Sequence, residues 1–123
     1  MKENIRSLRE RTKIFGVRVV RMYAALPNGR AAQTLGYQAL RSGTSVGAHY
    51  REAYRSRSDA EIISKLETAL QELDETSYWF ELLIDAEIVT AGRLRSLSVE
   101  ANELTAILVT TVKKIKARRA RKT

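Results

Sequence analysis

The feature that most constrains the fold is a long apolar stripe in the middle of the chain, between residues 59 and 86. Its members recur at intervals of three and four residues, the period of an α-helix with one buried side. They are Ile62, Leu66, Ala69, Leu73, Thr76, Phe80 and Leu83. Ser58 and Glu61 precede the stripe in the order of a capping box, in which each side chain bonds the other residue's backbone amide. The sequence therefore predicts a capped helix over 59–86.

Three other segments show the same period and predict helices over about 4–26, 31–55 and 91–117. The run Leu-Pro-Asn-Gly at 26–29 ends the first of them, because proline cannot continue the hydrogen-bond ladder and Asn-Gly favours a turn. With one proline and six glycines, the chain has too few breakers for an all-β fold. Four helices joined by short loops predict an all-α fold, an antiparallel up-down-up-down four-helix bundle.

Charge is distributed unevenly along the chain, whose net charge is +8. Residues 1–57 hold 12 basic and three acidic side chains, a net +9, whereas residues 58–90 hold nine acids against one lysine, a net −8. Residues 113–123 hold seven basic side chains and no acid, a net +7. We therefore divide the chain into a bundle body, 1–112, and a basic tail, 113–123, that continues the fourth helix. The opposite blocks predict attraction between helices, within one chain or between chains.

Several classes of protein are disfavoured by composition. The chain contains no cysteine, which excludes disulfides, thiol chemistry and cysteine-based metal sites. No apolar run approaches the ~20 residues that span a bilayer, and the charged start of the chain lacks the apolar core of a secretory signal. We therefore expect a cytoplasmic protein with no membrane partner, no small-molecule substrate and no cofactor.

Four polar residues at helical spacing line one stripe of the second helix: Arg41, Ser45, His49 and Glu52. One interpretation is a functional polar site. The other, which we favour, is a structural network in which Glu52 accepts from an arginine and the serine hydroxyl bonds a carbonyl, because an unpaired charge there would be costly. Gly43 and Gly47 support this interpretation, since small residues one turn apart permit close contact between helices.

Neither metal binding nor catalysis is predicted. His49 is the only histidine, and no His/Glu pair has a ligand spacing such as Glu-x-x-His. Glu72, Asp74 and Glu75 are candidates for acid–base chemistry, but no nucleophile or phosphate-binding loop lies near them in the sequence. We predict no catalytic, cofactor-binding or metal-binding residue, and no enzymatic activity.

Three consecutive aromatic residues, Tyr78, Trp79 and Phe80, point to different sides of the third helix. They cannot all face one core. We predict that at least one packs on another subunit, because aromatic residues are enriched at interfaces, and Tyr78 and Trp79 are the candidates.

The basic tail admits two interpretations. Its cations are Lys113, Lys114, Lys116, Arg118, Arg119, Arg121 and Lys122. Positive charge suits the C-terminal end of a helix dipole and promotes solubility. Alternatively, the tail contacts the phosphates of RNA or DNA, in which case binding would be largely independent of sequence and weaken steeply with salt.

Short motifs in a fixed order resemble the family of small four-helix-bundle proteins encoded in intervening sequences of bacterial 23S rRNA genes. The motifs are Gln38 with Arg41-Ser42 and Thr44-Ser45-Val46, Ala48-His49-x-x-Glu52-Ala53, Ser58 with Lys65-Leu66-x-x-Ala69, and Glu75-Thr76-x-Tyr78-Trp79-x-Glu81-Leu82-Leu83. The resemblance covers most of the chain and is best from 35 to 83. The chain departs from the family's usual asparagine at His49.

The resemblance implies a cytoplasmic four-helix bundle that assembles as a homopentamer and has no assigned enzymatic activity. In fold and charge the chain also resembles the basic, pentameric accessory protein of diversity-generating retroelements, which works with a reverse transcriptase and its RNA. Our leading hypothesis is an oligomeric scaffold or binding module that contacts RNA, DNA or a nucleic-acid-bound partner. The alternatives are a purely structural assembly protein with a solubilising tail, a retroelement accessory protein and, from another class, an enzyme with an unrecognised site.

Overall fold

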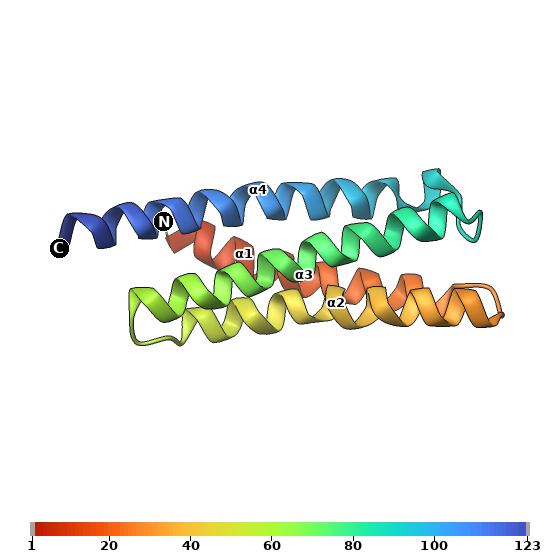
Figure 1. Ribbon diagram of the computed structural model, residues 1–123, viewed down its shortest axis with the longest axis horizontal. Helices are drawn as coiled ribbons and strands as arrows, with labels where there is room; N and C mark the ends of the chain where they lie inside the picture. Colours follow the sequence, from red (N-terminus) through yellow and green to blue (C-terminus); the bar gives the residue numbers. More distant parts are fainter. Residues whose placement is uncertain (1, 123) are drawn as a thin grey trace.

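The structure, a computed structural model, describes residues 2–122, with side chains from residue 8 onward. It consists of four α-helices: α1 (Lys2–Ala24), α2 (Arg30–Tyr54), α3 (Asp59–Asp85) and α4 (Ala91–Lys122). Successive helices run antiparallel in an elongated bundle (Figure 1), and none of the described residues forms a strand. The predicted fold class is confirmed.

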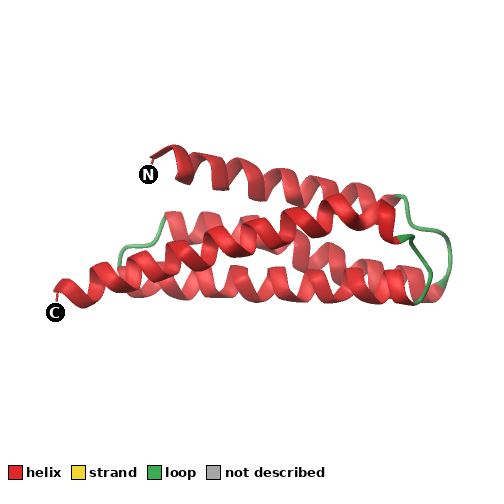
Figure 2. Ribbon diagram, turned by 90° about the horizontal axis from the view of Figure 1, so that it is seen from above, coloured by secondary structure: helices red, strands yellow, loops and turns green. Residues whose placement is uncertain are grey.

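The antiparallel topology divides the chain's connections between two ends of the bundle. The start of α1, the α2–α3 connection and the free end of α4 lie at one end, and the other two connections lie at the opposite end (Figures 1 and 2). The last turns of α4 extend beyond the other three helices in both views. Segments far apart in the sequence, around residues 9, 55 and 119, are therefore gathered at one end.

The helix bounds differ from the predicted ones in ways that local chemistry explains. α1 ends at Ala24, and Leu26 lies in the connection, packed against the core. The basic tail is helical as far as Lys122, beyond the predicted end at about 117. Ser58 caps α3 by accepting a 3.2 Å hydrogen bond from the Glu61 amide. The Glu61 carboxylate accepts from the amide of residue 57 at 3.0 Å and not from that of Ser58, so the reciprocal half of the predicted capping box is wrong.

The buried face of α3 agrees with the predicted stripe except that Ile63 is buried and Ile62 only partly. For the second helix the sequence predicts one inward side made of Leu35, Gln38, Ser42, Ser45, Val46, His49 and Ala53. Of these, Ser42, Val46 and Ala53 are buried in α2, whereas the other four are only partly buried. The residues buried on α2 are mostly small: Ala32, Gly36, Ala39, Ser42, Gly43, Val46, Tyr50 and Ala53. Alanine and glycine contribute little to an apolar pattern in the sequence, although such residues allow neighbouring helices to approach closely.

Gly43 and Gly47 lie where α2 meets α1, as their spacing predicted. A Cβ atom built on Gly43 would stand 2.9 Å from both Cγ atoms of Val19, and one on Gly47 would stand 3.4 Å from Thr12. Val19 is completely buried. Gly43 is therefore a position at which the packing of α1 on α2 requires the absence of a side chain.

The four helix–helix interfaces are unequal. The largest joins α2 and α3, and the smallest joins α1 and α4. At the centre of the larger one, the hydroxyls of Ser42 and Thr76 are 2.7 Å apart and fully buried. The smaller interface is bridged by polar groups, with the Arg11 guanidinium 2.7 Å from Glu100 and 3.0 Å from Glu103.

Candidate nucleic-acid interface

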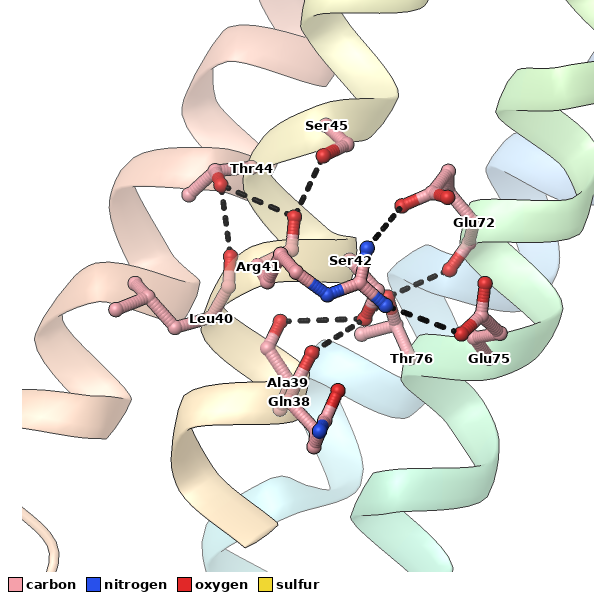
Figure 3. A network of polar contacts seen from close by, with 10 residues as sticks. All are labelled: Gln38, Ala39, Leu40, Arg41, Ser42, Thr44, Ser45, Glu72, Glu75 and Thr76. Carbon is pink, nitrogen blue, oxygen red and sulfur yellow. Dashed lines mark hydrogen bonds and ion pairs between the residues drawn. The ribbon is translucent and has the colours of Figure 1, made fainter. Parts of the chain in front are cut away.

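The polar stripe of α2 does not converge on a single site. Figure 3 shows Arg41 reaching across to α3, where its guanidinium lies 3.3 Å from Glu75 and 4.0 Å from Glu72. The Ser45 hydroxyl donates a 2.7 Å hydrogen bond to the Arg41 carbonyl, as predicted for the serine. The hydroxyl of Thr44 donates in the same way to the carbonyl of Leu40 at 2.7 Å.

The other half of the stripe forms a second, separate cluster. The Glu52 carboxylate lies 2.9 Å from the Lys65 ammonium on α3 and 3.7 Å from Nδ1 of His49. The predicted pairing of Glu52 with an arginine is therefore wrong, because Arg41 lies nearly three turns away and has two carboxylates of its own on α3. The hydrogen bond from Lys65, more than any other contact, holds the pKa of Glu52 below its usual value. Arg41, Ser45, His49 and Glu52 thus share a helix face, from which Arg41 and Glu52 join α2 to α3 at two levels.

The aromatic residues of α3 occupy three environments, as their spacing predicted. Phe80 is buried in the core, Trp79 is partly buried against it, and Tyr78 is 52% exposed. The rings of Tyr78 and Trp79 meet edge to face with centroids 5.2 Å apart. The indole Nε1 of Trp79 is buried and has no hydrogen-bond partner among the described residues. Tyr78 is the member of the pair that offers an open surface.

Two cations of the tail are bound to α3. Arg118 lies 2.6 Å from Asp59, at the start of α3, and Lys116 lies 3.1 Å from Glu67. The hydrogen bond from Arg118 is the main cause that lowers the pKa of Asp59, and the charges of Lys122 and Arg119 lower it further. The tail is therefore a continuation of α4 that is anchored on α3, and its other cations remain exposed.

We define the basic end of the bundle by the cations that gather where α1 begins, α2 ends and α4 ends. None of their side chains has a hydrogen bond or ion pair to another described residue. They are Arg9, Arg51, Arg55, Arg57, Lys113, Lys114, Arg119, Arg121 and Lys122. One hollow, about 370 Å³ in volume, is lined by Arg57, Arg119 and Lys122, and a smaller one is lined by Arg9, Arg51 and Arg55.

Most acids near the basic end are already engaged. Glu52 is paired with Lys65 and Asp59 with Arg118, and the Glu61 carboxylate accepts from a backbone amide. The charges of Glu52 and Asp59 are thus balanced mainly by Lys65 and Arg118, which lie outside the set of nine cations. The net field at this end is therefore positive, which favours polyanions.

The Asp59–Arg118 pair gives a testable dependence of stability on pH. Because folding lowers the pKa of Asp59, the pair stabilises the fold above the pKa of an unfolded aspartate, about 3.9, and this contribution is lost as pH falls through the folded value. We expect the free energy of unfolding, measured with urea between about pH 6 and pH 3, to fall less steeply in Asp59→Asn. Glu81→Gln, on the exposed side of the same helix, is the control and should keep the original slope. Equal slopes in Asp59→Asn and the unmodified protein would contradict this prediction.

A protein-family model described as that of the 23S rRNA-intervening sequence protein matches residues 7–110. The chain belongs to this family. The match confirms the resemblance inferred from the motifs of α2 and α3. The seven cations of the tail all lie beyond residue 110, so this family's model does not describe the part of the chain that contributes most to the basic end.

A solved relative supports the same assignment. The crystal structure of a Bacteroides thetaiotaomicron protein of the S23 ribosomal protein family superposes with a TM-score of 0.84 at 39% sequence identity. The likeness covers 92% of this chain and 99% of that one, whose function is described as unknown. No curated protein sequence matches this chain. Membership of the 23S rRNA-intervening sequence family thus establishes the fold and leaves the activity open.

The described residues offer little for other chemistries. No three acidic or histidine side chains among them are grouped so as to hold a metal ion. None of the helices, over the residues described, combines the length and apolarity that a bilayer crossing needs.

Sequence reasoning missed two parts of the candidate interface. The sequence places Arg41, Arg51 and Arg55 on the exposed basic side of the second helix and makes this side a candidate for ligand contact beside the tail, but it does not predict that Arg51, Arg55 and Arg57 lie at the same end of the bundle as the tail. Tyr54, which is 60% exposed among them, was not singled out. Its spacing of four from Tyr50 was the available signal, since it places both rings on one side of α2.

Proposed function

We propose that this protein is a non-enzymatic binding module that holds the phosphate backbone of RNA or DNA against the basic end of its bundle. The observation that carries the proposal is that nine cations with no side-chain hydrogen bond or ion pair to a described residue gather at one end, from α1, α2, the α2–α3 connection and α4. Cations held apart by a rigid scaffold lose little freedom when they meet phosphates, and their counterions are released on binding. The contacts would be to the backbone, so binding is expected to be largely independent of sequence.

The helical form of the tail adds to this proposal. Arg118 and Lys116 tie α4 to α3, which holds Arg119 and Lys122 beside Arg57. A tail that served solubility alone would not need a fixed position. Fixed cations favour a partner with charges at regular intervals, such as a nucleic-acid strand.

The test is a titration of fluorescein-labelled RNA and DNA with the full chain over a salt series. We expect log K to fall linearly with log salt between about 50 and 200 mM, with a slope of about −0.7 to −0.9 for each phosphate contacted. Absence of binding at the low-salt end, or binding that does not respond to salt, would overturn the proposal.

A second candidate function, assembly with further copies of the chain, is favoured by a separate observation on α1. Ile14, Val17 and Val20 are 52%, 42% and 46% exposed and lie on one outer face of the helix. An unpartnered row of β-branched residues commonly marks a contact surface. We infer that it packs on the outer ridge of α3 in a neighbouring copy.

The outer ridge of α3 is opposite in charge to the rim of this face. Its exposed residues are Glu67, Gln71, Asp74, Tyr78, Glu81 and Asp85. The apolar row of α1 is flanked by Lys13 and Arg21, and Tyr78 supplies an open ring in the middle of the acidic ridge. A contact between two different surfaces is heterologous and can close into a ring, which agrees with the homopentamer that the family resemblance implied.

Val17→Glu tests this assembly. Placing a carboxylate in the apolar row and opposite the acidic ridge should shift an oligomer towards monomer in sedimentation equilibrium at micromolar concentration. Val99→Glu is the matched control, because Val99 is exposed to a similar extent, 49%, on α4, and should leave the mass unchanged. A monomeric unmodified protein, or an unchanged mass for Val17→Glu, would contradict the assembly.

A further inference from the structure

The last turn of α2 carries an open aromatic ring surrounded by cations. Tyr54 is the helix's final residue and is 60% exposed, the largest exposure among the large apolar side chains that remain open. It shares a shallow hollow with Tyr50, Arg51, Arg55 and Arg9. The hollow measures only about 10 Å³, so a ligand must lie over it and cannot enter it.

The three arginines of this cluster have no partner within the described part of the chain. Arg51 and Arg55 stand one helical turn apart, so their like charges repel each other in the free protein. Their position at the C-terminal end of α2 offsets part of that repulsion through the helix dipole. A bound anion would relieve the rest, which makes the cluster a receptive surface for phosphate.

Resting on the proposed function, we propose that the basic end prefers single-stranded nucleic acid, and that one unpaired base stacks on the Tyr54 ring while Arg9, Arg51 and Arg55 hold the adjoining phosphates. An exposed ring beside backbone-binding cations is the usual way in which proteins bind single strands without reading their sequence. A duplex keeps its bases stacked inside and offers only its phosphates and grooves to such a surface. The Tyr54 ring is therefore expected to contribute to the binding of single strands and not to the binding of duplexes.

An acidic peptide is the competing partner for three arginines. It would use their charge but would gain little from an exposed phenol ring. Tyr54→Ala can therefore distinguish a nucleic acid from an acidic peptide, because it removes the ring without changing any charge.

The experiment measures the affinity of the full chain for a labelled oligouridylate and for a labelled RNA duplex at one low salt concentration. Tyr54→Ala is expected to weaken oligouridylate binding by about 5- to 100-fold and duplex binding by less than about 2-fold. Tyr54→Phe, which keeps the ring, should bind as the unmodified protein does. Tyr37→Ala is the matched control, because Tyr37 is 54% exposed on the same helix near its other end. Ultraviolet cross-linking of the oligouridylate should label Tyr54 and spare Tyr37.

The outcomes separate this inference from the proposed function. If the unmodified protein binds neither oligomer, both are overturned. If it binds both and Tyr54→Ala changes neither, or weakens both equally, the stacking inference is overturned while the phosphate-binding function stands. Loss of binding in Tyr54→Phe as large as in Tyr54→Ala would also overturn it, because the hydroxyl and not the ring would then be responsible.

Discussion

Gly43→Val is expected to lower the free energy of unfolding by about 3 kcal/mol, the upper part of the range for overpacked cores. A Cβ atom at this position would already stand 2.9 Å from both methyl groups of Val19, and the two further methyl groups of valine have no free space. Val19 is β-branched and completely buried, so it cannot rotate away cheaply. α1 would have to move off α2, which would loosen the contact that carries Phe15 into the core. Urea denaturation measures the loss, which is a large fraction of the 5–15 kcal/mol typical of a domain.

Gly16→Ala is the matched control, because Gly16 lies on the facing side of the same interface. Its added Cβ atom would stand 3.8 Å from the nearest atom, Cα of Thr44, an ordinary contact. We expect this variant to be more stable by up to about 1 kcal/mol, since alanine is the better helix former. If Gly43→Val were as stable as the unmodified protein, the close approach of α1 and α2 at Val19 would be wrong.

Removing four cations from the basic end is expected to weaken nucleic-acid binding by about two orders of magnitude at low salt, as four phosphate contacts are lost. The variant combines Arg57→Gln, Arg119→Gln, Arg121→Gln and Lys122→Gln. These residues are exposed and make no side-chain hydrogen bond or ion pair to other described residues, so the fold should be kept. The slope of log K against log salt should become shallower by about 3 units. Fluorescence anisotropy over the salt series measures both quantities.

The chain offers a control of equal charge at the opposite end of the bundle. Arg21→Gln, Arg30→Gln, Arg93→Gln and Arg95→Gln remove four exposed arginines and bring the net charge from +8 to the same +4 as the first variant. If binding follows position, this second variant keeps most of its affinity and its slope. If the two variants lose affinity equally, net charge alone governs binding, and the basic end is not a site.

Variants of the basic end also help to decide between the functions that membership of the family leaves open. The matched region, 7–110, excludes the tail cations, so membership of the family does not by itself assign a role that depends on them. Self-association through α1 and α3 does not depend on the tail. The charge variants and Val17→Glu can therefore separate a chain that only assembles from one that also binds a polyanion.

The four helices and the inward face of α3 could be predicted from the sequence alone, because helical period and capping are local properties carried by neighbouring residues. The separation of positive from negative charge along the chain could be read from the sequence as well. The inward face of α2 was predicted only in part, at Ser42, Val46 and Ala53, because the alanine, serine and glycine residues that pack there contribute little to an apolar pattern.

The contacts between residues of different helices could be established only from the tertiary structure. Arg41 pairs with Glu75, and Glu52 with Lys65, because α2 and α3 run antiparallel at a register that no local pattern specifies. The basic end exists for the same reason: an up-down-up-down topology brings Arg9, Arg55 and Arg119 to one end although they lie far apart in the chain. Local periodicity sets each helix, whereas the partners of a side chain depend on the packing of small residues between helices.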